Sequence, residues 1–490
     1  MSVRSAVVKN ALWMFGAEII DKLCGPILLF VFAHIFGSLV MGQYSFVMSY
    51  VAFMFMLADL GTTVYAIREC AKKPKKLTFY LSHALTMRIV LTLLALAAVG
   101  SAFFIDKPST VLIALFLYAL SIALANIQNV FEITFYSRND LKAIAIGRII
   151  ERVALFGFGI YVIFATKNFM LFVACHLLAQ ILHFCWIFFN SRKFSKPALA
   201  YNWRVWKKFV VYGIPIALTG FLFFVYFRID ILMISFLRGD QEVGWYSAAY
   251  RLLDMVQFFP YILSYSIFPA LLQLHKKDQA LANALFTRAA RMLLILAIPI
   301  TFAIFSLAPL IVTIIYGADF LQTIPVLRVV ILIVPLLFLD SLFRYVIYTI
   351  SKEWQYLFIL LALAVFNVVL NFIFIPKYGF VAAAWTTLVS EALGFVLLLR
   401  MILKGGFTLS LKRTLFSLFR AIIAAVAVFW LASTFWPYEL ATIISLIAYA
   451  LIMFLVEFDQ GDKELIREAT SGIGKYVSAL YNIVREKSGL

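Results

Sequence analysis

Residues 226–254 are YFRIDILMISFLRGDQEVGWYSAAYRLLD, two apolar arms joined by a short polar turn around Asp240. This pattern predicts two membrane-spanning helices that meet at the turn. Arg228 lies twelve residues before Asp240 and Arg251 lies eleven residues after it. In antiparallel helices both arginines would therefore lie at a similar depth, roughly 17 Å from the turn. A charge at that depth marks either a functional site or a paired structural ion.

The composition of the whole chain excludes a soluble globular domain. Of its 490 residues, 64% are hydrophobic and only 13% are charged, whereas about a quarter of an average soluble domain is charged. The net charge of +18 would suggest nucleic acid as the partner of a soluble protein. Here the basic residues lie in short loops between apolar runs, so a role in membrane topology explains them better, and no nucleic acid is expected.

Apolar runs of about twenty residues recur along the chain and predict an all-α polytopic membrane protein with about 14 transmembrane helices. The expected helices are residues 11–36, 41–67, 79–104, 110–136, 142–165, 168–190, 209–237, 243–273, 284–315, 322–350, 354–375, 379–403, 414–434 and 438–457. Lys and Arg concentrate in alternate loops, and the remaining loops carry only Lys107, Lys167, Arg238 and Lys377. By the positive-inside rule, this asymmetry predicts a multi-pass protein of the cytoplasmic membrane with both termini in the cytoplasm.

A short repeat suggests how these helices are organised. GSLVMGQYS at residues 37–45 matches GDQEVGWYS at residues 239–247, and each copy joins the first and second helix of a six-helix block. We therefore expect two lobes related by a parallel repeat around a central cavity, although a chance match is the alternative. The expected parts are an N-terminal lobe (1–190), a basic cytoplasmic linker (191–208), a C-terminal lobe (209–403), helices 13 and 14 (404–457), and a tail (458–490) that is either an amphipathic helix or a frayed terminus.

Ionisable residues inside the predicted spans are too many for lipid-facing surfaces, so they predict a hydrated, cationic cavity. Arginine there suits a phosphate or carboxylate, because its planar fork makes bidentate hydrogen bonds. The arginines expected to bind substrate are Arg228, Arg251, Arg148, Arg152 and Arg328. The carboxylates expected to couple to an ion are Glu18, Asp21, Glu151 and Glu391, with supporting roles for Asp230, Asp254 and Asp59. Local ion pairs are the structural alternative, as is snorkelling for Arg88, Glu132 and Arg344.

Other chemistry has little support in the sequence. His176 and His183 lie seven residues apart on one helix face, where a proton relay is conceivable but two satisfied core histidines are the simpler interpretation. Nothing completes a metal-ligand set around them. The chain has neither a nucleotide-binding loop nor a G-x-S-x-G nucleophile motif. We expect a transporter and not an enzyme, without a cofactor or metal, and with coupling to H⁺ or Na⁺ left open.

Four stretches carry a family resemblance. They are ADLG at residues 58–61, RID at 228–230 with the G-x4-G-x-Y-S-A-A-Y-R-L stretch at 239–252, YGADF at 316–320 and NVVLNFIFIPKYG at 367–379. With them the chain resembles the polysaccharide and O-antigen flippases of the multidrug/oligosaccharidyl-lipid/polysaccharide exporter superfamily, from the first helix to the fourteenth. The resemblance implies two six-helix lobes that form a V around a central cavity. It also implies that the protein moves a polyprenyl-phosphate- or pyrophosphate-linked oligosaccharide from the inner to the outer leaflet.

The partners expected from this resemblance are the polyprenyl-phosphate-linked glycan, membrane lipids and glycan-assembly proteins. Three alternatives differ in class. An exporter of drugs or organic cations would favour a negatively charged cavity, and such relatives usually have twelve helices. An integral-membrane polymerase, ligase or glycosyltransferase usually needs a sizeable outer loop, whereas every predicted outer loop here is short. A scaffold without transport would explain neither the repeat nor the charged interior.

Overall fold

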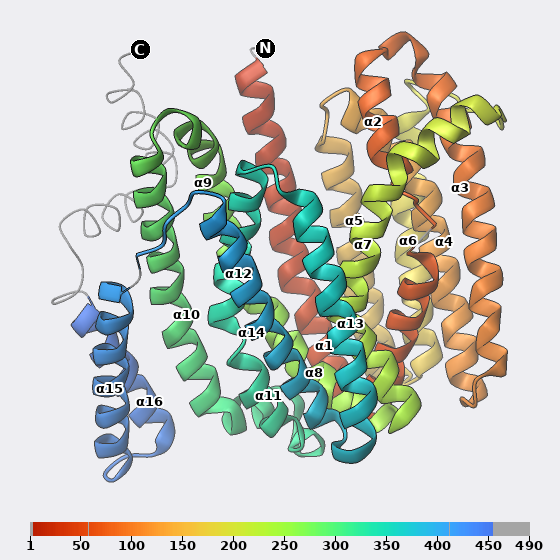
Figure 1. Ribbon diagram of the computed structural model, residues 1–490. Coiled ribbons are helices and arrows are strands. Elements are labelled where there is room, and N and C mark those ends of the chain that lie inside the picture. The colour runs from red at the N-terminus through yellow and green to blue at the C-terminus, as the bar shows by residue number, and fades with distance from the viewer. Residues whose placement is uncertain (1–2, 57, 411, 454–490) are drawn as a thin grey trace. The chain divides into compact units, whose positions relative to one another are not determined.

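The computed structural model describes residues 3–56, 58–410 and 412–453, and every regular element within them is helical (Figure 1). The α-helices are α1 (Val3–Phe55), α2 (Thr62–Lys72), α3 (Leu77–Val99), α4 (Ser109–Ser137), α5 (Lys142–Ala165), α6 (Phe169–Ser191), α7 (Trp203–Leu237), α8 (Asp240–Val256), α9 (Phe258–Lys277), α10 (Gln279–Tyr316), α11 (Thr323–Ile331), α12 (Val334–Thr349), α13 (Glu353–Tyr378), α14 (Phe380–Lys404), α15 (Lys412–Ser433) and α16 (Tyr438–Ile452). Short 3-10 helices are η1 (Pro74–Lys76), η2 (Gly100–Phe104) and η3 (Ala318–Phe320). The predicted all-α membrane fold is confirmed.

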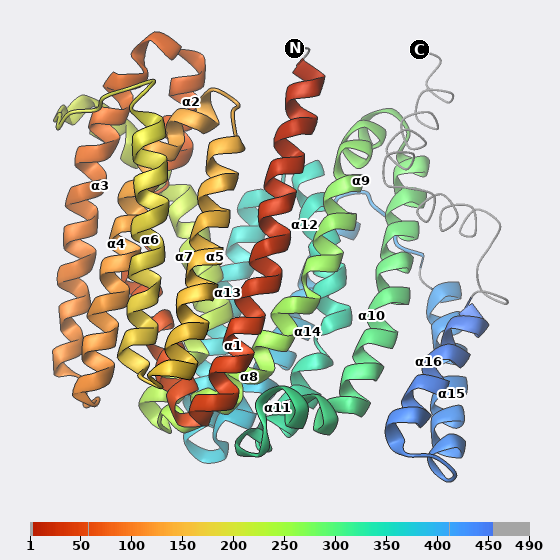
Figure 2. The same cartoon turned by 180° about the vertical axis from the view of Figure 1, so that it is seen from behind.

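The chain forms two compact units. The first comprises the chain up to Arg251 together with Thr313–Val326 and Leu360–Thr386, and the second comprises Leu252–Val312, Leu327–Ile359 and the described residues from Thr387 onward. In the first unit, α5 and α6 pack side by side, α1 packs on α5, and α4 packs on α6 (Figure 2). In the second unit, α9 packs on α12, and α15 and α16 form an antiparallel hairpin (Figure 1).

The predicted count of fourteen spans is not confirmed. In the described residues, eight helices are long and apolar enough to cross a membrane, and α11 with α12, bent by 43°, forms a ninth if counted as one span. One reason is that α1 is counted once although it contains two helices joined by a kink at Gly37, where φ is 78° and ψ is 179°, which lies at the break predicted between residues 36 and 41. That backbone conformation is open almost solely to glycine. Within the described residues, α15 and α16 contribute the apolar segments Leu418–Ser433 and Tyr438–Ile452.

Other boundaries differ for local reasons. The helix predicted for residues 41–67 ends at Phe55, because Leu60 and Gly61 take positive φ values of 44° and 65° before α2 begins. The helix predicted for 243–273 is divided at Gln257 into α8 and α9. By contrast, α5 coincides with the prediction of 142–165. The predicted tail at 458–490 and the end of the last predicted helix lie outside the described residues.

The two copies of the repeat contact each other backbone to backbone. A Cβ atom on Gly42 would lie 1.6 Å from the carbonyl oxygen of Asp240, and one on Gly244 would lie 1.9 Å from that of Ser38. Gly42 and Gly244 are equivalent positions of the repeat, as are Ser38 and Asp240. The contact is therefore reciprocal, as a two-fold relation between the copies requires. Only glycine allows this approach.

The loops predicted on the outer face meet at this same end of the first unit. Lys107 forms a buried ion pair of 2.5 Å with Asp240. Glu242 accepts hydrogen bonds from Arg238 (2.9 Å) and from the backbone N–H of Phe380 (3.0 Å). The segments around residues 107, 240 and 379 are therefore together, as the predicted alternation of loops requires. Which end faces the cytoplasm stays a prediction from the loop charges.

Candidate functional site

The first unit encloses a polar cavity of about 360 Å³ between α1, α4, α5 and α6. Its charged lining residues are Glu18, Asp21, Glu132, Arg148, Glu151 and Arg152. Further polar lining comes from Tyr118, Ser121, Gln128, Asn129, His176, Gln180 and His183. Five of the carboxylates and arginines expected from the sequence thus line one cavity, namely Glu18, Asp21, Arg148, Glu151 and Arg152.

Helical periodicity explains why these side chains converge. On α5 the lining residues are Arg148, Glu151, Arg152 and Leu155, and on α6 they are His176, Ala179, Gln180 and His183. Both sets follow the spacing i, i+3, i+4, i+7, which places side chains on one face of a helix. The remaining faces of these helices are largely apolar. The sequence pattern of α5 and α6 therefore places their polar residues on the helix faces that line the cavity.

Two ion pairs involve residues of α1, and they differ in distance and in exposure to solvent. Arg152 Nε bonds directly to the Asp21 carboxylate, and about a third of each side chain is exposed. The pair therefore remains accessible from the cavity. Glu18 and Lys22 are 3.9 Å apart and nearly half exposed, and such an exposed pair contributes little to stability. Asp21 with Arg152 is the stronger link between α1 and α5.

The charge balance of the cavity differs from the sequence prediction. Four carboxylates, those of Glu18, Asp21, Glu132 and Glu151, face two arginines, Arg148 and Arg152. With neutral histidines this lining carries a formal charge of −2. The expectation of a cationic lining is wrong for this cavity, because four carboxylates line it, Arg152 is paired with Asp21, and Glu132 does not snorkel. Glu132 is 6% exposed.

The arginines of the α7–α8 hairpin lie outside the cavity lining. Arg251 Nη2 is 3.8 Å from Sδ of Met48, which does line the cavity, so Arg251 is at its margin. Arg228 is half-buried on α7. Asp230 is buried and accepts hydrogen bonds from the Tyr246 hydroxyl and from the N–H of Ile231. The hairpin therefore supplies Asp230 with partners of its own, beyond the neighbouring arginine.

The second unit holds the other expected residues and an apolar groove. Arg328 donates to the carbonyl of Phe305 (3.4 Å) and its guanidinium lies over the Phe305 ring. Glu391 is buried on α14, and Asp254 is half-buried on α8. The groove has a volume of about 290 Å³ and is lined by Ile298, Pro299, Thr301, Phe302, Phe305, Leu332, Pro335, Ile422, Ala425, Leu446 and Tyr449, from α10, α12, α15, α16 and the α11–α12 bend.

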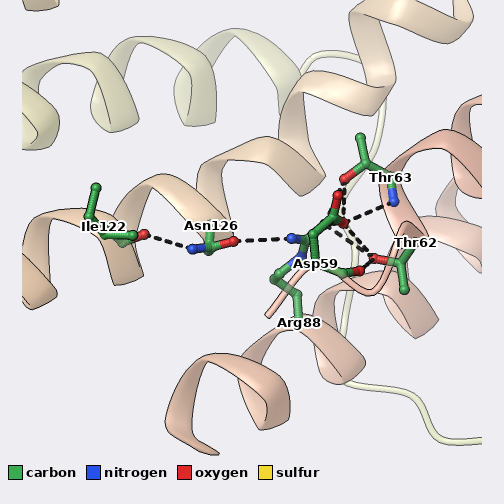
Figure 3. A network of polar contacts seen from close by, with 6 residues as sticks. All are labelled: Asp59, Thr62, Thr63, Arg88, Ile122 and Asn126. Carbon is green, nitrogen blue, oxygen red and sulfur yellow. Dashed lines mark hydrogen bonds and ion pairs between the residues drawn. The ribbon is translucent and has the colours of Figure 1, made fainter. Parts of the chain in front are cut away.

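A separate polar network surrounds Asp59, where the chain leaves α1 and enters α2 (Figure 3). Arg88 is 1% exposed, pairs with Asp59, and donates to Asn126 (3.1 Å) and Thr63 (2.6 Å). Asp59 also accepts from the backbone N–H of Thr63 at 3.2 Å, as a helix cap does. The snorkelling alternative for Arg88 is therefore wrong, because its guanidinium is buried among these acceptors. Asp59 supports the start of α2 and does not line the cavity.

A family model for polysaccharide biosynthesis proteins matches residues 7–275, more than half of the chain. The chain belongs to the polysaccharide biosynthesis protein family. A comparison with curated protein sequences finds no match. The family assignment therefore rests on the model, and it agrees with the resemblance carried by the stretches at 58–61 and 228–252.

Solved structures share the fold of this polysaccharide biosynthesis protein. The lipid II flippase MurJ in an inward closed conformation has a TM-score of 0.72 and 16% identity, over 91% of this chain and 98% of that one. An inward-facing multidrug resistance MATE family transporter of the MOP superfamily has a TM-score of 0.62 and 10% identity, over 78% and 95%. A MOP superfamily transporter from Pyrococcus furiosus gives 0.54 and 12%, over 82% and 96%. At these identities the likeness shows a shared transporter fold.

Sequence analysis of this family member missed the amides of the cavity. Gln128 on α4 and Gln180 on α6 hydrogen-bond to each other at 2.8 Å, and neither was selected from the sequence. The available signal was the spacing of Ser121, Gln128 and Glu132 along a mostly apolar helix. Glutamines in apolar helices are as often structural links between helices as parts of a site, so spacing alone does not separate the two.

Proposed function

We propose that the protein is a flippase that moves a polyprenyl-phosphate- or pyrophosphate-linked oligosaccharide from the inner to the outer leaflet by alternating access. Membership of the polysaccharide biosynthesis family and the transporter fold support this proposal. The observation that carries it is that one chain provides both a polar cavity with arginines and a wholly separate apolar groove. A lipid-linked sugar phosphate needs both environments, whereas a small soluble substrate needs only the first.

The cavity would receive the phosphate head and the sugar. An anionic head crosses a low-dielectric slab at high cost unless polar groups replace its water. Arg148 and Arg152 lie on the cavity face of α5, one helical turn apart, and can together present two guanidinium forks to a phosphate. Arg152 would exchange its bond with Asp21 for one with the phosphate. Arg251 at the cavity margin, Arg228 on α7 and Arg328 in the second unit would bind the head at other stages of the cycle.

The lipid tail would use the groove beside α15 and α16. The groove lining is apolar apart from Thr301 and Tyr449, and Tyr449 directs its hydroxyl to the carbonyl of Ile295 at 3.2 Å. An isoprenoid chain could therefore lie there without burying an unpaired polar group. The α15–α16 hairpin follows the two six-helix lobes expected at 1–190 and 209–403, so it is an addition to the transporter core suited to a lipid substrate.

An exporter of organic cations is the second candidate, and one observation favours it. The cavity lining has four carboxylates and two arginines, and an acidic lining attracts cations. The fold is shared with a multidrug resistance transporter. Under either function Glu18, Asp21, Glu151 and Glu391 are the proposed ion-coupling carboxylates, with Asp230, Asp254 and Asp59 in support. Family membership and the apolar groove favour the lipid-linked glycan.

Reconstituted vesicles test the proposed flippase. A fluorescent short-chain prenyl-pyrophosphoryl sugar is placed in the membrane, and an impermeant reductant bleaches the outer leaflet. The protein should make the inner-leaflet pool bleachable. Arg152→Gln should slow this at least about tenfold, since a charged hydrogen bond to phosphate is lost. Arg204→Gln, at the exposed start of α7, is the matched control and should act as wild type. Bleaching at the rate of empty vesicles would overturn the proposal.

A further inference from the structure

His183 on α6 lies between two carboxylates from two other helices. Its Nδ1 is 2.7 Å from Oε2 of Glu151 on α5. Its Nε2 is 3.7 Å from Oε1 of Glu132 on α4. The imidazole is 3% exposed, yet all three side chains line the cavity. Three titratable groups therefore meet where a proton can be exchanged with cavity water.

The Glu151 carboxylate and the Gln128 amide define the surroundings of the ring. The Gln128 Nε2 is 2.9 Å from Oε1 of Glu132, and it is 3.1 Å from Nε2 and 3.2 Å from Nδ1 of His183. The Gln128 Oε1 accepts from the Nε2 donor of Gln180. The amide therefore lies nearly equidistant from the two ring nitrogens and links the ring to Glu132. Because an ionised carboxylate only accepts hydrogen bonds, the contact with Glu151 assigns a proton to Nδ1 of His183.

A second proton would bind at one defined atom. It forms an N–H bond on Nε2 of His183, the ring nitrogen that lies 3.7 Å from Oε1 of Glu132. The proton comes from cavity water, and nothing is oxidised or reduced. The two states thus differ by one proton on Nε2 of His183, which is a suitable basis for a switch.

The backbone of α5 makes room for the imidazole. Gly147 lies one turn before Glu151, and a Cβ atom on it would be 2.5 Å from Cδ2 and 2.6 Å from Nε2 of His183. Glycine inside a helix costs about 1 kcal/mol relative to alanine. This position therefore lowers the stability of α5, but it leaves space for the imidazole of His183. Gly147 is a positioning residue for His183.

The surrounding charges favour proton uptake when an anion enters. The titratable and charged groups that face the cavity are Glu18 and Asp21 from α1, Tyr118 and Glu132 from α4, Arg148, Glu151 and Arg152 from α5, and His176 from α6. His176 is held by the Tyr44 hydroxyl at 2.9 Å. The lining has two more carboxylates than arginines. Each further negative charge in the cavity therefore strengthens the attraction of the lining for a proton.

We propose that His183, held between Glu132 and Glu151, is a proton-binding site whose occupancy is linked to anion binding in the cavity. Each bound anion is accompanied by about one proton on Nε2 of His183. At an effective dielectric of about 20, charges one to two helical turns apart change each other's binding roughly tenfold, and the linkage is reciprocal. The inference rests on the proposed function only for the identity of the anion.

The first test measures proton uptake on binding. Purified protein in nanodiscs and choline buffer receives a short-chain prenyl-pyrophosphoryl sugar, whose two phosphodiesters do not titrate near neutral pH. A pH indicator should record about one proton taken up per probe bound, and affinity should fall roughly tenfold from pH 6 to pH 8. His183→Gln and Gly147→Ala should abolish both effects. His83→Gln removes an equally buried histidine that bonds the Ala200 carbonyl and should retain both.

The second test does not depend on the lipid substrate. Solid-state ¹⁵N NMR of histidine-labelled protein contains a signal for His183, assigned by its loss in His183→Gln. It should show the Nδ1–H tautomer at pH 8 and a doubly protonated ring at pH 6. A ring that stays neutral throughout this range overturns the proton site. So does proton uptake unchanged in His183→Gln, or probe binding that requires Na⁺ and ignores pH. Failure of the probe to bind, with the NMR result as expected, refutes the flippase and leaves the proton site standing.

Discussion

The backbone contact between the two repeat turns makes a strong prediction for Gly42→Ala. The added Cβ would lie 1.6 Å from the Asp240 carbonyl oxygen, while ordinary contacts begin at 3.4 Å. The turns must therefore separate by about 2 Å, and forced overpacking of this kind costs about 1–3 kcal/mol. Gly16→Ala in the same helix is the control, because nothing lies within 4 Å of its Cβ and alanine favours the helix by up to about 1 kcal/mol.

The difference in unfolding free energy between these two variants should be about 2–4 kcal/mol. Tryptophan fluorescence during unfolding of both variants in one detergent measures it. Gly244→Ala should cost as much as Gly42→Ala, since it meets the Ser38 carbonyl at 1.9 Å. The double variant should cost clearly less than the sum, because one alanine already opens the shared contact. Equal stability of Gly42→Ala and Gly16→Ala, or full additivity, would refute the packing of the repeat turns.

Three further predictions concern topology, energy source and the hairpin. Reporter fusions should be outside at Lys107, Arg238 and Lys377 and inside at Lys75, Lys196 and Lys276; a reversal within this set contradicts the topology. Transport in sealed vesicles should proceed without ATP and respond to an ion gradient, so strict ATP dependence of the purified protein would exclude the proposed coupling. Arg228→Lys should impair flipping less than Arg228→Ala, because lysine keeps the charge and loses the fork. Adding Asp230→Asn to the alanine variant should restore expression and not flipping, and full flipping would make Arg228 a structural ion.

The sequence was sufficient for the helical class, the hairpin at 226–254 and the converging residues of α5. Its failures have local causes. The helix predicted for 41–67 ends at Phe55, because Leu60 and Gly61 take positive φ values that its hydrophobic pattern does not reveal. The pairing of Asp21 with Arg152 joins residues far apart in the chain, and only packing brings them together.

The polarity of the cavity was the hardest property to predict. Arginines inside apolar helices suggested a cationic lining, but the balance depends on which carboxylates face the same space. The sequence places Glu132 near a helix end, where it could snorkel, whereas in the structure Glu132 of α4 is buried beside His183 of α6. Helix rotation is set by neighbouring helices, so the sequence of one helix does not define it.

The central claim is that the substrate is an anionic lipid-linked sugar, and a direct competition between substrate classes tests it. Vesicles containing the protein are offered a labelled prenyl-pyrophosphoryl sugar and a fluorescent organic cation together, under the same ion gradient. We predict that the labelled lipid crosses at least about tenfold faster than in vesicles with Arg152→Gln, while cation flux equals that of empty vesicles. Cation transport with no movement of the labelled lipid would contradict the account and establish the exporter instead.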